Sequence, residues 1–141
     1  MKKMITVLTI LLCTSNAFAG SKDLKTMNTL IDAGAATEQF MSQVHLGLDE
    51  VECAYSVHSK TYVCHADDIS GNEGQGAGIK FEGKAAKRLF NALVADGGTT
   101  DGGMGKIFVS AKAFRCSQSV EGVADGSEAE RTGCYVQVIV E

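Results

Sequence analysis

Apolar residues recur at helical spacing in two stretches of the chain. Residues 21–34 carry one amphipathic face and end in a glycine, and residues 83–96 carry a similar face with basic residues near its start. The apolar positions are Leu24, Met27, Leu30 and Ile31 in the first stretch, and Leu89, Phe90, Leu93 and Val94 in the second. Each stretch therefore predicts a helix with one buried face.

Apolar and polar residues alternate after each predicted helix, which is typical of β-strands. The alternating segments are residues 44–48, 51–55, 61–66, 107–111, 114–116 and 134–140. The alternation changes parity once near Asp49 and Glu50, and again between Ala111 and Phe114. One extra residue at such a place, a β-bulge or bend, would keep both sets of apolar residues facing the core.

The segment from residue 51 to 67 reads as a β-hairpin. If Cys53 lies opposite Cys64 on antiparallel strands, Tyr55 falls opposite Tyr62, and the turn lies at residues 58–59. The cysteine face of this hairpin is then the buried one.

The two halves of the chain resemble each other. Residues 20–56 placed over residues 83–119, at a constant offset of 63, give eight identities in 37 positions, against about two or three expected by chance. The identical pairs are Gly20/Gly83, Asn28/Asn91, Leu30/Leu93, Gly34/Gly97, Thr37/Thr100, Met41/Met104, Cys53/Cys116 and Ser56/Ser119. We therefore predict a duplicated helix-plus-hairpin unit.

These patterns predict an α+β fold of the order αββ-αββ. We expect one domain over residues 20–141, made of repeats 20–67 and 83–141 joined by a glycine-rich loop at 70–78. Each half is too small to bury its own apolar face, so both should share one core. The predicted architecture is a four-stranded antiparallel sheet with both helices on one face. A polar link precedes Val44, and a flexible link covers residues 96–105.

The first nineteen residues predict a secretory signal peptide. Lys2 and Lys3 precede an apolar run over residues 4–12, and Ala17-Phe18-Ala19 provides the small residues of a cleavage site. The run is about half of the ~20 apolar residues that a membrane span needs. We therefore predict a bacterial protein that is periplasmic or secreted.

Four cysteines follow the predicted cleavage site, which in an exported chain indicates two disulfides. Their spacing lacks the close cysteine pairs of structural zinc sites. Three pairings are possible. Pairing within each half, Cys53 with Cys64 and Cys116 with Cys134, is favoured because hairpin neighbours already have the required separation.

Charge and motifs exclude several functions. The net charge is −4, and there is no run rich in Lys or Arg, so we expect neither nucleic-acid nor anionic-membrane binding. The glycine-rich segments lack a phosphate-binding motif, and no nucleophile motif or acid–base pair stands out. His65 with Asp67 and Glu52 offers at most a weak metal site. We therefore expect neither an enzyme nor a cofactor.

A protein-binding function remains the favoured hypothesis. In architecture alone, a duplicated helix-plus-hairpin unit with one disulfide per half resembles certain secreted proteins that inhibit hydrolases. Binding residues usually lie in loops on a rigid scaffold, and the loops here are residues 70–78, 97–105 and 121–131. The favoured role is that of an inhibitor or immunity-type protein for an extracellular enzyme or toxin. The candidate binding residues are Asn72, Glu73, Gln75, Thr99, Thr100, Asp101, Asp125 and Glu128. The alternatives are a self-assembling envelope module, such as a homodimer, and a small-molecule or metal binder.

Overall fold

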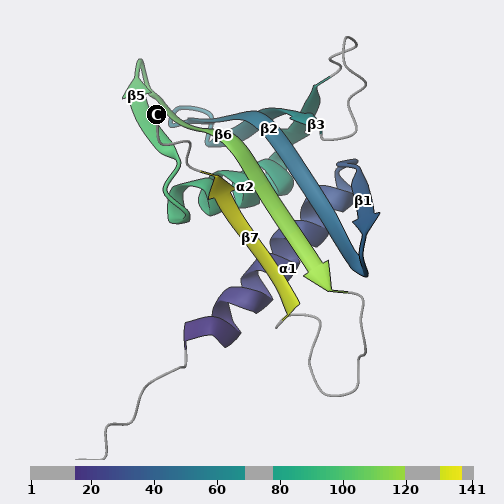
Figure 1. Cartoon of the computed structure of the whole chain (residues 1–141). Helices are drawn as coiled ribbons and strands as arrows, with labels where there is room; N and C mark the ends of the chain where they lie inside the picture. The colour runs from purple at the N-terminus through teal and green to yellow at the C-terminus, as the bar shows by residue number, and fades with distance from the viewer. Residues whose placement is uncertain (1–14, 69–77, 120–130, 138–141) are drawn as a thin grey trace, which may run out of the picture.

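A computed structural model describes residues 15–68, 78–119 and 131–137, with side chains described from Lys22 onward. It contains two helices and seven strands in the order shown in Figure 1. The elements are α1 Ser15–Asp32, β1 Thr37–Phe40, β2 Gln43–Ser56, β3 Thr61–Asp68, β4 Ile79–Glu82, α2 Gly83–Ala95, β5 Thr99–Gly103, β6 Lys106–Ser119 and β7 Thr132–Gln137. Helix α1 begins before the predicted cleavage site and runs through it.

All seven strands belong to one antiparallel sheet, so the predicted four-stranded sheet is wrong. The long strands β2 and β6 pair along their whole length at the centre. Along its other edge, β2 pairs first with β1 and then with β3, and β4 extends the sheet beyond β3. Along its other edge, β6 pairs first with β5 and then with β7. The two helices lie on one side of this sheet (Figure 1), so the overall class remains α+β-like.

The extra strands β1 and β5 were predicted as links because both are short and exposed. Every residue of both strands is exposed, so neither carries an alternating apolar signature. Each joins its long neighbour through a tight turn whose two residues have positive φ, Met41 and Ser42 in one turn and Met104 and Gly105 in the other. Turns of this handedness match the twist of paired strands and favour a hairpin. The third extra strand, β4, pairs with β3 directly before α2.

The central strands bend where the sequence predicted a parity change. The register between β2 and β3 shifts between Asp49 and Glu52, and Glu50 has a φ of 46°. Before the bend Leu48 lies opposite Phe114, and after it Val51 lies opposite Ala111. This confirms the predicted bulge, which keeps both apolar sets on the helix side.

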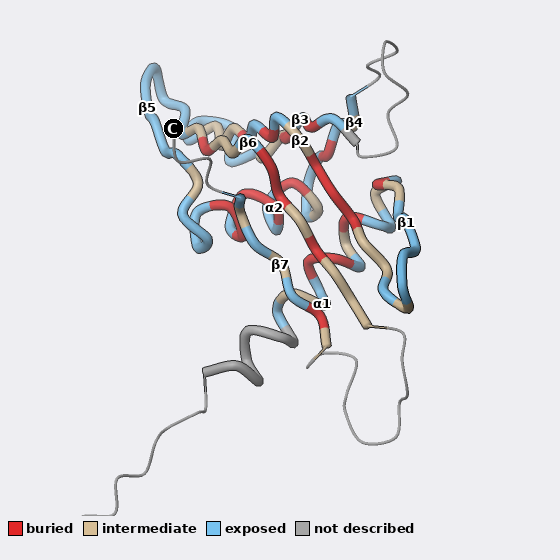
Figure 2. Tube along the Cα trace, in the orientation of Figure 1, coloured by how far each residue is buried: buried red, intermediate tan, exposed pale blue. Residues whose placement is uncertain are grey.

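The core lies between the helices and the inner face of the sheet (Figure 2). Side chains from α1, α2, β2, β3, β4 and β6 form one continuous cluster. Its largest fully buried members are Phe81, Phe114, Met27, Leu30, Leu46, Leu48, Leu89, Leu93, Val51 and Val109. Both halves thus share a single core.

Both disulfides favoured from the sequence are present. Cys53 bonds to Cys64 across β2 and β3, and Cys116 bonds to Cys134 across β6 and β7. Next to the first disulfide, the rings of Tyr55 and Tyr62 lie 4.4 Å apart, on paired strand positions as predicted.

The two halves match in their helix ends and central strands. Gly34 and Gly97, 63 residues apart, follow the helices with φ values of 100° and 91°. Ala35 after α1 and Gly98 after α2 each donate the backbone N–H to the carbonyl five residues back. This is the Schellman arrangement. The bounds of β2 and β6 also differ by 63 residues at both ends.

Gly98 also allows a close approach between α2 and the sheet. A Cβ at this position would lie 2.9 Å from the Val109 side chain and about as close to the carbonyl oxygens of Leu93 and Ser110. By contrast, a Cβ at Gly103 would meet nothing within 4 Å. Because Gly98 has no side chain, the end of α2 can lie directly against β6.

Candidate functional site

The face of the sheet opposite the helices is the candidate functional surface, and we name it the open face. No helix of the described chain covers it (Figure 1). The strand register places alternate residues of seven strands on it. Its members include Glu38, Phe40, His45, Asp49, Glu52, Val63, His65, Asp67, Lys80, Glu82, Thr99, Asp101, Lys106, Phe108, Arg115 and Tyr135.

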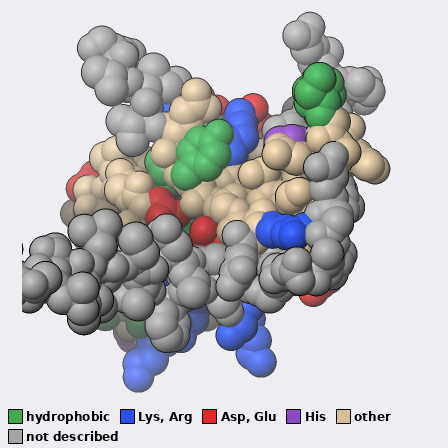
Figure 3. All heavy atoms as spheres, turned by 60° about the horizontal axis from the view of Figure 1, so that its bottom comes forward, with side chains coloured by type: hydrophobic (Ala, Val, Ile, Leu, Met, Phe, Trp, Pro, Cys, Tyr) green, Lys and Arg blue, Asp and Glu red, His purple; other side chains and the backbone are tan. Residues whose placement is uncertain are grey.

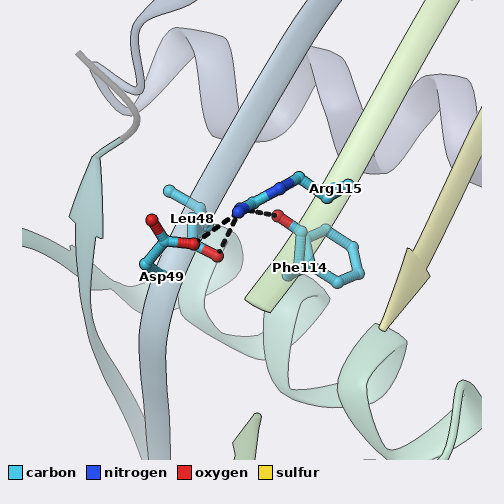
Figure 4. A network of polar contacts seen from close by, with 4 residues as sticks. All are labelled: Leu48, Asp49, Phe114 and Arg115. Carbon is cyan, nitrogen blue, oxygen red and sulfur yellow. Dashed lines mark hydrogen bonds and ion pairs between the residues drawn. The ribbon is translucent and has the colours of Figure 1, made fainter. Parts of the chain in front are cut away.

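Arg115 is held in a fixed position at the centre of the open face. Its guanidinium donates to the carbonyl oxygen of Leu48 at 3.1 Å and to a carboxylate oxygen of Asp49 at 2.6 Å. Figure 4 shows it reaching from β6 across to β2, with a longer contact of 3.5 Å to the Phe114 carbonyl. A planar guanidinium with several partners loses little further freedom on binding, so Arg115 forms a pre-organised centre.

The open face is hollowed on both sides of the bend. One hollow of about 320 Å³ lies over β1, β2, β6 and β7, and its polar lining consists of Glu38, His45, Arg115, Ser117 and Tyr135. The other, of about 490 Å³, lies over β2, β3 and β6 and includes Glu52, Val63, His65 and Lys106. The open face therefore carries two shallow hollows, whose linings combine acidic, basic and apolar side chains.

The open face carries more negative than positive charge. Six carboxylates project from its strands, compared with three cations, leaving aside the Glu50 and Lys112 pair at the bend. Two of the three cations, Lys80 and Arg115, pair with carboxylates of the same face. Beside Lys80, the pKa of the Glu82 carboxyl is lowered by the hydrogen bond and charge of that lysine. The described strands therefore give this face an excess of negative charge.

Exposed apolar side chains stand at the two ends of the central strands. At one end, Phe40 and Met41 in the β1–β2 hairpin are 64% and 81% exposed. At the other end, Met104 is fully exposed beside Val57, whose N–H donates to the Gly105 carbonyl. Tyr135 is also half-exposed on the open face. Figure 3 shows such isolated apolar side chains among polar ones.

Of the loop residues predicted to bind a partner, three are described. Thr99, Thr100 and Asp101 form strand β5 instead of a loop, and all three are exposed. Thr99 and Asp101 share the open face, and the Asp101 carboxylate accepts a hydrogen bond from Gly102 at 2.7 Å. The remaining candidates lie outside the described residues: Asn72, Glu73, Gln75, Asp125 and Glu128.

Sequence reasoning missed the open face itself, including Arg115, Tyr135 and Phe40. The alternation of residues in β2 marked an outer face, but nothing in the sequence said that β1 and β5 would extend that face. Within the described ranges, no three His, Cys, Asp or Glu residues come together in a way that could hold a metal ion.

Comparison with family models, with curated proteins and with solved structures found no match for this chain. The two disulfides are compatible with an extracellular protein stabilised by disulfides. Among the helices that the structure describes, none combines the length and apolar character of a membrane span.

Proposed function

We propose that this chain is an exported, non-catalytic protein that binds another protein through its open face. The observation that carries the proposal is an acidic sheet face that no described helix covers, built around the fixed Arg115 side chain. The central strands β2 and β6 have fourteen residues each, so the face is about 45 Å long at the usual strand rise. A surface of this length suits a folded protein better than a small ligand.

The partner that this face fits is a protein with a basic surface patch. Its cations would meet carboxylates of the open face that form no ion pair within the described ranges, among them Glu38 and Glu52. Exposed aromatic side chains such as Phe40 and Tyr135 supply contact area at low entropic cost. An inhibitor or immunity-type role toward an extracellular enzyme or toxin is the function of this kind that we favour.

Site-specific photo-crosslinking in the producing cells tests this proposal. A photoreactive phenylalanine analogue replaces Phe40 or Tyr135 on the open face, and Val94 on α2 serves as the control, because it is apolar and 46% exposed. We expect one heterologous protein to be captured from both open-face positions and not from Val94. Capture from Val94 alone, or equal capture from all three positions, would contradict the proposal.

The captured protein is then purified and its affinity measured by calorimetry. We expect Glu38→Lys together with Glu52→Lys to weaken binding at least about tenfold, and added salt to weaken binding of the unaltered protein. Asp32→Lys on α1, compared with Glu38→Lys or Glu52→Lys alone, is the control for net charge and should leave the affinity nearly unchanged. An affinity insensitive to the open-face variants would refute the assignment of the surface.

A further inference from the structure

Another hollow lies on the opposite side of the molecule, between the outer surfaces of α1 and α2. We name it the helix groove. Its volume is about 340 Å³, and its lining consists of Lys22, Thr26, Lys84, Lys87, Arg88 and Asn91. Four of these six residues are cations and none is an acid. In a chain of net charge −4, this concentration of positive charge is a local feature of the fold.

Within the described part of the chain, no ion pair neutralises the cations of the helix groove. On the sheet, Lys80, Lys112 and Arg115 each lie within 4.0 Å of a carboxylate. Among the described residues, no such pair involves any of the four groove cations, although Lys87 lies 6.0 Å from the Tyr62 ring. Lys and Arg side chains project from the lower margin of Figure 3, on the helix side of the molecule. The groove is therefore a region of positive potential open to solvent.

The spacing of the donors defines the size of a ligand. Lys84, Arg88 and Asn91 stand four and three residues apart, so they form one row along α2 about 10 Å long. Lys22 and Thr26 face this row from α1. Ammonium, guanidinium and amide groups together donate to oxygen anions, and guanidinium binds phosphate with two parallel hydrogen bonds.

Two acids limit the charge at one end of the groove. Asp23 and Asp96 lie near Lys22, and burial together with the charge of Asp23 raises the pKa of Asp96. Neither acid lines the hollow. The α2 side, with Lys84, Lys87 and Arg88, therefore supplies most of the attraction for an anion.

Two of these cations, both on α2, are not repeated on α1, although Arg88 corresponds to Lys25. At the offset of 63 that relates α1 to α2, Lys84 corresponds to Ser21 and Lys87 to Leu24. The two helices end in the same way, although their residues at these two positions differ. The lysines of α2 are thus free to serve a ligand.

We infer that the helix groove binds a soluble anion that carries two or three linked phosphate groups. A row of donors about 10 Å long exceeds a single phosphate and matches a short polyphosphate. The site is separate from the open face, so this inference stands or falls independently of the proposed protein partner.

Calorimetry with inorganic tripolyphosphate tests the inference. We expect the unaltered protein to bind the probe, and Lys84→Glu with Arg88→Glu to weaken binding at least about tenfold. Lys84→Gln with Arg88→Gln should give a smaller loss. The matched control is Lys106→Glu with Lys112→Glu, which changes the net charge equally on the sheet and should leave the affinity within about twofold. Circular dichroism verifies that each variant is folded.

Two results would overturn the inference. One is absence of binding to tripolyphosphate, or an equal loss in the Lys106 and Lys112 control, which would reduce the effect to net charge. The other comes from sedimentation with phosphatidylcholine vesicles with and without phosphatidylglycerol. Binding to the anionic vesicles without binding to tripolyphosphate would assign the groove to a membrane surface instead.

Discussion

The two disulfides should stabilise the two halves by nearly equal amounts. The perturbation is a pair of double variants, Cys53→Ala with Cys64→Ala, and Cys116→Ala with Cys134→Ala. The bonds close loops with sequence separations of 11 and 18 residues. The loop-entropy relation gives about 2.8 kcal/mol for the first bond and about 3.2 kcal/mol for the second at 25 °C.

Packing offsets this small difference. Cys53, Cys64 and Cys116 are essentially fully buried, whereas Cys134 is only partly buried. If each buried sulfur contributes about as much as a methylene, ~0.8 kcal/mol, the first variant loses more packing than the second. Each double variant should therefore lower the free energy of unfolding by about 4 kcal/mol, a large part of the 5–15 kcal/mol typical of domains.

Urea denaturation followed by far-ultraviolet circular dichroism measures both losses. Reduction of the unaltered protein is the control, because it opens both loops but keeps all four sulfurs; it should cost about 6 kcal/mol. The reasoning is refuted if one variant loses less than about 1 kcal/mol while the other loses more than about 3 kcal/mol. That result would mean that only one half depends on its disulfide.

Three further predictions concern single positions. A double-mutant cycle of Asp49→Ala and Arg115→Ala, read by urea denaturation, should give a coupling of about 0.5–1 kcal/mol for this partly exposed pair; no measurable coupling would contradict the fixed position of Arg115. Gly98→Ala should cost about 1–3 kcal/mol through its close contacts, while Gly103→Ala should cost clearly less; equal costs would argue against the close approach of α2. The pKa of Asp96 is raised in the folded state. Ionisation of Asp96 therefore lowers the free energy of unfolding as pH rises from 3.8, the ordinary pKa of this carboxyl, through its raised pKa in the folded protein. Asp96→Asn should therefore raise the melting temperature slightly at pH 7 and not at pH 3, and a gain at both pH values would exclude ionisation as the cause.

Local signals in the sequence predicted much of the fold correctly. The glycines at 34 and 97 mark helix ends because their φ values are accessible mainly to glycine. The pairing of Cys53 with Cys64 followed from alternation on two adjacent strands, and the parity change near Asp49 marked the bulge. Each of these features is set by interactions between residues that are close in the sequence.

The number of strands could not be predicted in the same way. Strands β1 and β5 bury no side chains, so they leave no apolar pattern and are held by backbone hydrogen bonds to β2 and β6. The Met41–Ser42 turn contains no glycine, although both residues have positive φ. Composition alone therefore favoured a link at that position.

The candidate sites were hidden for a different reason. Arg115 meets Asp49 across 66 positions of sequence, and Lys22 meets the basic row of α2 across a similar separation. A sequence without a Lys- or Arg-rich run can still gather cations when two helices pack side by side. The charge of the whole chain thus says little about the charge of one of its surfaces.

The central ladder shows which positions the fold requires. Adding 63 to the β2 residue of a pair and subtracting 63 from its β6 partner gives another pair between the same two strands. Leu48 opposite Phe114 thus corresponds to Ala111 opposite Val51. The two halves place the same kinds of residue where cores, helix ends and disulfides need them. They differ at Arg115, which corresponds to Glu52, and at Lys84, which corresponds to Ser21. The repeat does not fix these unequal charges, and this supports the two binding roles that we propose for them, one on each side of the molecule.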